Sequence, residues 1–380
     1  MRQFIIRRLF LFIPGIFFVV LFSFILLHLA PGDPVDRLLS SKGVFDPSPS
    51  ALTASHSQRD EIRKQLGLDL PLFYISISSL EEKNVLRHKP AAGWQAYIPC
   101  ITIQPKNQFH RWLFGDESYS DGILRGDFGI SWMTGQPVSE IISGRLRWSL
   151  FFTLLSVFLA FLISIPAGMK AASRPGSAFD RIMSGLTIVV FSLPTFWIAT
   201  LLMLLFCNPD VLNWLPSSGV APAGGYTADQ SLGTIILTSI PYLILPTFCY
   251  TYGAIAFISA SVKAATTDIL RSDFIRTARA KGVGERGILY VHTLRNAWLP
   301  MITIFSQVFP LAIGGSVILE TIFTIPGMGL TIYQGIASQD FPVIIAVFMI
   351  TGFVTMLGYL LADILYAVAD PRVSHSTIPA

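Results

Sequence analysis

The chain has 380 residues, of which 52% are hydrophobic and only 13% are charged. Average soluble proteins carry roughly 25% charged residues, so the low charge argues against a soluble protein and favours a membrane protein. The net charge of +4 is small and no Lys- or Arg-rich tail occurs, so we expect no nucleic-acid partner.

Long apolar runs dominate the sequence. A bilayer core requires about 20 mostly apolar residues per helix. Six runs of this kind lie at residues 9–29, 150–169, 186–207, 235–258, 298–319 and 343–367. Helices buried in a soluble protein are the alternative, but six such runs with charged flanks favour membrane spans. We therefore predict an all-α membrane protein with six transmembrane helices and a large external loop between the first and the second. Prolines inside the spans predict kinked helices, at Pro194, Pro241, Pro246, Pro300 and Pro310.

Basic residues in the short loops predict the orientation. They occur in the N-terminal segment and in the loops after the second and fourth runs, and the loops after the third and fifth runs have none. Because short cytoplasmic loops carry the excess of Lys and Arg, we expect both termini in the cytoplasm, with the chain embedded in a lipid bilayer. The first run is longer than a signal-peptide core, so we expect it to remain as a span.

These boundaries divide the chain into four parts. Residues 1–30 hold the N-terminus and the first helix, and residues 31–147 form an external region too long to be a bare connector. Residues 148–372 form a core with helices two to six, including a cytoplasmic loop at 260–296, and residues 373–380 form a cytoplasmic tail. The external region has one plausible amphipathic helix, at 56–66. Its aromatic residues are either interface anchors or contacts to an external partner, namely Trp94, Tyr97, Trp112 and Tyr119.

The cytoplasmic loop at 260–296 has an unusual composition for this chain. Good helix formers fill 264–281, then Gly282-Val283-Gly284 interrupts them, and a second helix is predicted at 285–296. Phe274 and Ile275 offer an apolar anchor, and neighbouring arginines offer charge around it. Two short helices with a glycine hinge would form a rigid knob for another surface. On the pattern alone, a basic loop that only obeys the positive-inside rule explains these residues equally well.

A resemblance to a known family favours the knob. The segment DFIRTARAKG (273–282), followed by RNAWLP (295–300), resembles the cytoplasmic "EAA" loop of ABC importer permeases, in the version of the dipeptide/oligopeptide/nickel family. The chain has Arg-Thr-Ala at 276–278 where the general signature has Glu-Ala-Ala. Other segments resemble that family in the right order, namely APGDP (30–34), QLGLDLP (65–71), GDFGIS (126–131), SLPTFW (192–197), ETIFTIPGMG (320–329) and DILYAVADPR (363–372). The external region is longer than the family pattern.

The resemblance implies a transporter made of several subunits. This chain would pair with a second, homologous permease, two ATPase subunits would dock on its loop, and an extracytoplasmic substrate-binding protein would deliver the cargo. Because the chain has no GxxxxGK[ST] phosphate loop, it is expected to be a transport subunit and not an enzyme, with ATP and Mg²⁺ bound by the partner ATPases. Candidates for the coupling contact are Asp273, Phe274, Ile275, Arg276, Thr277, Ala278, Arg279, Lys281, Gly282 and Glu285.

The sequence says less about which molecule is transported and which residues line its pathway. Peptides dominate the family, and nickel chelates, glutathione and peptide antibiotics are alternatives. A polar cargo needs hydrogen-bonding groups along its pathway through the spans. The candidates are Ser192, Thr195, Ser306, Gln307 and Ser316. Packing between helices is the competing explanation for these polar residues. A secondary transporter should show buried coupling acids or inverted repeats; only Asp363 qualifies as such an acid, and we see no internal repeat. The three Cys residues have no CxxC spacing, so neither a structural disulfide nor a metal site is expected.

Overall fold

A computed structural model describes residues 2–29, 63, 68–79, 99–115, 121–222, 231–313 and 316–369. The predicted helix at 56–66, apart from Arg63, lies outside the described residues, and so does the tail at 373–380. The described chain falls into two compact units. One unit comprises Met1–Phe22, Ile142–Ala337 and Val347–Ala380, and the other comprises Ser23–Ile141 and Ser338–Ala346.

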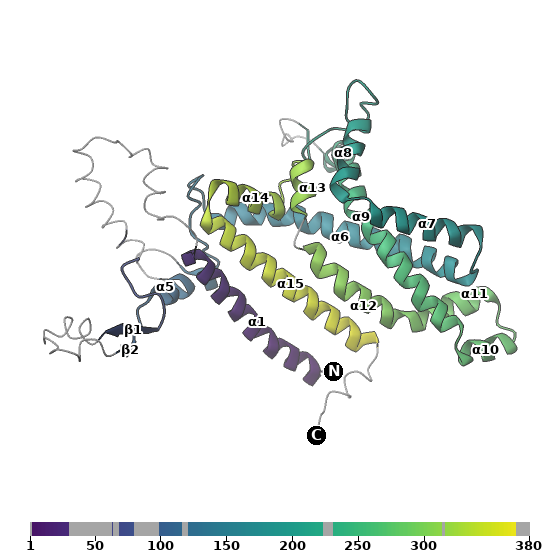
Figure 1. Ribbon diagram of the computed structural model, residues 1–380, viewed down its shortest axis with the longest axis horizontal. Helices are drawn as coiled ribbons and strands as arrows, with labels where there is room; N and C mark the ends of the chain where they lie inside the picture. The colour runs from purple at the N-terminus through teal and green to yellow at the C-terminus, as the bar shows by residue number, and fades with distance from the viewer. Residues whose placement is uncertain are drawn as a thin grey trace. The chain divides into compact units, whose positions relative to one another are not determined.

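Long helices account for the predicted apolar runs. They are α1 (Arg2–Leu29), α6 (Val138–Ser173), α7 (Ala178–Ser192), α8 (Thr195–Phe206), α9 (Leu232–Leu270), α12 (Leu294–Ile313) and α15 (Phe341–Ala369) (Figure 1). Among the described residues, α6, α9 and α15 are long and apolar enough to cross a membrane, and α7 with α8 could form a fourth span. The fifth predicted run was placed too far along the chain, because α12 ends at Ile313 and a separate helix begins at Val317.

Shorter elements fill the segments between these helices. They are β1 (Ile75–Ser79), β2 (Pro99–Ile103), α5 (Gln108–Phe114), the 3-10 turn η2 (Ile123–Arg125), α10 (Asp273–Ala280), α11 (Glu285–Gly287), the π-helical stretch η3 (Ile288–Thr293), α13 (Val317–Ile322) and α14 (Met328–Ser338). Strands β1 and β2 pair antiparallel, with Ile75 opposite Ile103. This small sheet departs from the all-α prediction, because five-residue strands are too short for a pattern of alternation to identify them securely.

A sharp bend divides the third predicted run. Helices α7 and α8 meet at 97°, so residues 186–207 do not form the single straight span that their hydrophobicity predicts. Leu193 is extended, with φ −100° and ψ 121°, as expected for a residue that precedes proline. Pro194 then caps α8 and brings no N–H that the helix would have to satisfy. The proline therefore breaks this helix, where we had predicted only a kink.

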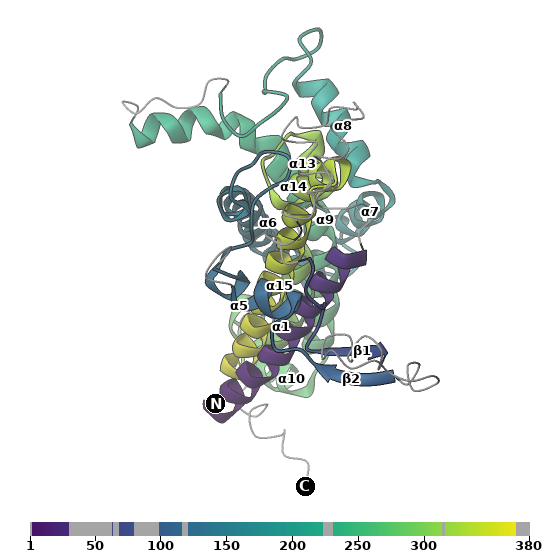
Figure 2. The same cartoon turned by 90° about the vertical axis from the view of Figure 1, so that its left-hand side faces the viewer.

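The first unit has two buried apolar clusters. One joins α6, α8, α9 and α13 through side chains that include Phe152, Leu245 and Leu319. The other joins α6, α9 and α12 through Met169 and Ile258, which have no exposed surface, and Met301. Figures 1 and 2 show α13 in the upper part of this unit and α10 at its lower end, with α9 extending between these levels. Helix α9 therefore extends from the level of α13 to the level of α10.

The second unit has an aromatic centre. The Phe24 ring is buried, and its centroid lies 5.3 Å from the Phe73 ring, 5.1 Å from Phe109 and 5.3 Å from Trp112. His28 Nε2 lies 2.9 Å from Gln108 Oε1, which adds a polar contact between α1 and α5. Trp112, one of the predicted interface anchors, thus packs within this unit. The other three, Trp94, Tyr97 and Tyr119, lie outside the described residues.

Candidate functional site: the helical loop between α9 and α12

Helix α10 has well-defined ends. Ser272 is extended and precedes the first turn, where Asp273 places a negative charge near the positive end of the helix dipole. At the other end, Gly282 has φ +81°, its N–H donates to the carbonyl of Arg279 at 2.9 Å, and Val283 N–H donates to the carbonyl of Ala278 at 3.2 Å. This is the Schellman arrangement, which satisfies the last carbonyl groups and favours glycine at the left-handed position. Helix α10 is therefore a short element with a fixed start and end.

The helices of the loop differ from the two that the sequence predicts. The helix expected at 264–281 is interrupted at Arg271 and Ser272, where α9 ends and α10 begins. The second helix expected at 285–296 is no separate element, because α11 continues through η3 into α12. The loop therefore consists of α10 between two long helices, with a turn at 281–284 on its C-terminal side.

Helix periodicity separates the candidate coupling residues into two faces. Ile275 has no exposed surface and Ala278 is buried, whereas Phe274 is 46% exposed. Positions three apart lie on the same side of a helix, so Ile275 and Ala278 share the inward face. The exposed members are Asp273, Phe274, Arg276, Thr277, Arg279, Lys281, Gly282 and Glu285. We name this exposed set the α10 face.

Charges on the α10 face are partly paired. Arg276 lies 3.1 Å from Asp273, and Arg279 lies 3.3 Å from Glu285, measured between side-chain nitrogen and oxygen. The Thr277 hydroxyl donates to the carbonyl of Asp273 at 3.0 Å. These pairs are exposed and thus contribute little stability, but they set where the arginines lie around Phe274. The face therefore presents one large apolar side chain among charged groups.

The pathway candidates do not converge. The hydroxyls of Ser192 and Ser306 donate to carbonyls of their own helices, those of Ile188 at 2.9 Å and Thr303 at 2.7 Å. Ser316 caps α13 by accepting from Leu319 N–H at 3.2 Å, and Thr195 is exposed at the start of α8. The side chain of Gln307 lies outside the described residues. Within the described part of the chain, no hydrogen bond joins any two of these candidates, so their common role stays a prediction.

A buried carboxylate near α13 was not singled out by sequence. Glu320 has no exposed surface. Its Oε1 accepts from the Ser149 hydroxyl of α6 at 2.9 Å and from the Tyr250 hydroxyl of α9 at 3.3 Å, while Oε2 accepts from Leu330 N–H at 2.8 Å. Within the described part of the chain, no cation forms an ion pair with this group. Glu320 thus joins α6, α9, α13 and α14 through hydrogen bonds alone.

Glycines make room for this carboxylate. A Cβ on Gly327 would lie 2.5 Å from the Glu320 carboxyl atoms, and one on Gly329 would lie 2.8 Å from Val317 N. Ser149 also accepts from Met328 N–H at 2.8 Å. Ser149 and Glu320 thus each accept from a backbone N–H in the first turn of α14. The signal available in the sequence was an acid beside two closely spaced glycines in an otherwise apolar segment.

Burial should make stability depend on pH through Glu320. Burial raises the pKa of Glu320 above its ordinary value of 4.5, and hydrogen bonds from Leu330, Ser149, Gly329 and Tyr250 oppose the rise. Between 4.5 and the raised pKa the folded protein binds more protons than the unfolded protein, so this group stabilises the fold as the pH falls through that window. We expect the melting temperature of the purified subunit, relative to its Glu320→Gln variant, to rise as the pH is lowered from about 7 to about 5. A difference that stays constant or shrinks over this range would contradict the assignment.

The described residues offer no metal centre, because within those ranges no group of three or more His, Cys, Asp or Glu side chains could hold a metal ion. The features that remain for function are the α10 face and the helices that support it. Both belong to a chain rich in apolar helices.

Comparison with known proteins identifies the family. Residues 164–375 match the family described as "Binding-protein-dependent transport system inner membrane component". The oligopeptide transport system permease protein AppB of Bacillus subtilis (strain 168) is 34% identical over 379 residues, which cover 99% of this chain and 100% of AppB. The dipeptide transport system permease protein DppB of Escherichia coli (strain K12) is 28% identical over 391 aligned positions, covering 99% of both chains.

A solved structure of the MetNI methionine ABC transporter, in an inward-facing conformation, is 18% identical, with a TM-score of 0.47. The similar region covers 60% of this chain and 96% of the transporter chain. The full-length relatives and the family match agree with the motif order in the sequence. The chain therefore belongs to the family of binding-protein-dependent transport system inner membrane components, and it is a permease subunit of an ABC transporter, which moves a substrate and does not catalyse a reaction.

Proposed function

We propose that this chain imports di- and oligopeptides across the bacterial inner membrane as one of two homologous permease subunits of an ABC importer. The proposal is supported by similarity along the whole chain to permeases named for oligopeptides and dipeptides. Nickel chelates, glutathione and peptide antibiotics are the alternative cargoes for the same machinery. Peptides are favoured because AppB and DppB are named for oligopeptide and dipeptide transport.

The proposed topology has six spans with both termini in the cytoplasm. Its support is the placement of basic residues, which occur at 170–181 and throughout 260–296 but not at 208–234 or 320–342. This arrangement keeps the predicted division of the chain into the first span (1–30), the helical core (148–372) and the cytoplasmic tail (373–380). Residues 31–147 form an external region on the side of the membrane opposite the termini. An external substrate-binding protein would then reach the side opposite the α10 face.

The α10 face carries the proposal for coupling. A helix with fixed ends, supported by buried Ile275 and displaying Phe274 among charged groups, has the properties of a docking element. Interfaces commonly centre on an aromatic anchor with a polar rim. We assign this face as the contact to one of two partner ATPases, which would bind ATP and Mg²⁺. Ile275 and Ala278 would support the contact from within the subunit.

Movement of α10 would reach the spans through its two neighbours. Helix α9 precedes it and α12 follows it through α11 and η3, so a push on α10 acts on both helices. Closure of the ATPase pair would thus shift the spans between inward-open and outward-open arrangements. The candidates for the substrate pathway remain Ser192, Thr195, Ser306, Gln307 and Ser316, of which Thr195 is exposed at the bend between α7 and α8.

Gentle purification of the tagged chain tests this function. We expect a second permease and an ATPase to co-purify. After reconstitution in proteoliposomes, ATP hydrolysis should rise on addition of a peptide-loaded binding protein and should accompany peptide uptake. Uptake driven by a proton or sodium gradient, without any ATPase partner, would instead establish a secondary transporter. Competition by glutathione or nickel chelates, but not by peptides, would replace the proposed cargo while leaving the coupling intact.

A further inference from the structure

The first turn of α7 is organised around Asp180. Ser177 caps the helix by accepting from Asp180 N–H at 3.2 Å, and Gly176 N–H donates to Asp180 Oδ2 at 3.0 Å. Lys170, at the end of α6, places its ammonium 4.5 Å from the centroid of the Phe179 ring. The bond from Gly176 orients the carboxylate of Asp180, whose second oxygen is turned to α9.

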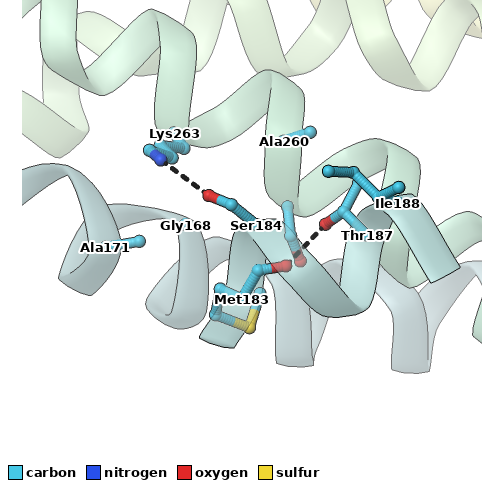
Figure 3. Close-up of a pocket in the computed structure, with 9 residues that line it drawn as sticks. Gly168, Ala171, Met183, Ser184, Thr187, Ile188, Ala260 and Lys263 are labelled. Carbon is cyan, nitrogen blue, oxygen red and sulfur yellow. Dashed lines mark hydrogen bonds between the residues drawn. The ribbon is translucent and has the colours of Figure 1, made fainter. Parts of the chain in front are cut away.

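Lys263 of α9 binds this carboxylate directly. Its ammonium forms an ion pair with Asp180 Oδ1. It also donates to the Ser184 hydroxyl, 3.0 Å away (Figure 3). The side chains of Lys263 and Asp180 are 33% and 12% exposed, so water screens this pair much less than a surface pair. We name these three residues the α7–α9 clasp.

The packing around the clasp is uneven. Helices α6 and α9 approach closely, since a Cβ on Gly168 would lie 2.8 Å from the carbonyl oxygen of Ser259 and 2.9 Å from Val262 Cβ. Beside this contact, residues of α6, α7 and α9 line a cavity of about 230 Å³, among them Gly168, Ser184 and Lys263 (Figure 3). Tightly packed helices move together, whereas a cavity leaves room for relative movement. At this level, the clasp is therefore a polar link between α7 and α9 at the edge of the cavity.

The clasp lies between the α10 face and the bent helix pair. Lys263 is about two helical turns before the end of α9 at Leu270, just ahead of α10. Asp180 and Ser184 lie on α7, which leads to the 97° bend and α8. The clasp thus joins the end of α9 that precedes α10 to the helix that leads to the bend.

We propose that the ion pair between Lys263 and Asp180, together with Ser184, transmits movement of the ATPase-docking loop to the bent pair α7–α8. These are positioning residues for coupling, and they contact neither ATP nor cargo. The inference rests on the proposed function of the 260–296 loop. It adds a specific route by which hydrolysis is converted into movement of a span.

The test compares coupling with stability in the complete transporter, reconstituted with its second permease, ATPases and binding protein. Asp180→Asn and Lys263→Met each leave one half-buried charge without its partner, so both should lower the melting temperature. Peptide imported per ATP hydrolysed should fall at least ~5-fold in each, the lower end of typical coupling between sites, because the clasp is broken. The double variant leaves no unpaired charge, so its melting temperature should recover, while the import ratio should stay low.

Two controls complete the design. Lys263→Arg keeps the ion pair and should retain the import ratio within about twofold. Arg181→Met removes an exposed cation from the same helix and should change neither readout. If the ratio recovers in the double variant together with stability, the pair is merely structural and the inference is overturned. It is equally overturned if the single variants import normally. If the wild-type complex hydrolyses ATP without importing peptide, the proposed function fails first, before the clasp is tested.

Discussion

Replacing Glu320 by leucine is expected to destabilise the subunit strongly. Leucine has a similar size but cannot accept a hydrogen bond, so the hydroxyls of Ser149 and Tyr250 and the Leu330 N–H would lose their acceptor. A buried polar group without a partner costs about 1–3 kcal/mol, so the three together should cost at least ~3 kcal/mol. The segment that carries α13 and the start of α14 would lose its hydrogen-bonded link to α6 and α9.

Thermal denaturation of the detergent-purified subunit, followed by size-exclusion chromatography, measures this effect. We expect Glu320→Leu to lower the melting temperature by ~6 °C or more. Glu320→Gln should have an intermediate effect, because an amide keeps one acceptor oxygen but turns donors toward donors. Asp210→Asn is the matched control, since Asp210 is exposed in the loop after α8. Equal melting temperatures for Glu320→Leu and Asp210→Asn would refute the proposed role of the buried carboxylate.

Replacing Gly282 by proline is expected to separate ATP hydrolysis from peptide uptake. Proline fixes φ near −65°, whereas Gly282 has φ +81°, and its N–H donates to the Arg279 carbonyl at 2.9 Å. Lys281 has ψ 7°, in a conformation that a following proline disfavours. The Schellman turn cannot form, and the incompatibility costs ~3 kcal/mol or more. Coupling between sites is typically about 1–3 kcal/mol, so its loss should lower peptide imported per ATP by about 10-fold.

A second proline substitution provides the matched control. Gly284 has φ −64° and ψ 154°, and a Cβ there would meet nothing within 4 Å. Gly284→Pro should therefore keep both import and hydrolysis near the wild-type level. The amount of each variant in the membrane, measured by immunoblot, shows whether the protein is made. Normal uptake by Gly282→Pro, or equal losses in the two variants, would contradict the coupling role of this turn.

Hydrophobicity located the long helices but not their full extent. The second run was predicted at 150–169, yet α6 begins at Val138 and continues to Ser173. Apolar length reports only the residues suited to the bilayer core, whereas a helix continues wherever its flanking residues favour one. The 97° bend had a visible cause in Pro194, but its size depends on how α7 and α8 pack against α9. A single sequence does not show how these helices pack, so it did not predict the angle of the bend.

The loop at 260–296 was predictable as a helical segment with a break at Gly282, but neither the bounds of its helices nor the orientation of its side chains was. Phe274 and Ile275 are adjacent and both apolar, and sequence alone did not show that Ile275 points inward while Phe274 stays exposed. The other two sites depend on residues that are distant in the chain. Glu320 meets Ser149 and Tyr250, and Asp180 meets Lys263, so only tertiary packing brings these partners together.

The fixed ends of α10 have a consequence for the speed and strength of assembly. A segment that must fold when it binds loses conformational entropy at that moment, and its affinity per unit of buried area falls accordingly. Helix α10 is already held by Ile275 from inside and by its Schellman turn, so little ordering remains when a partner arrives. Rigid docking of this kind favours association without a slow rearrangement step. The subunit would thus offer its partners a preorganised surface in every turnover.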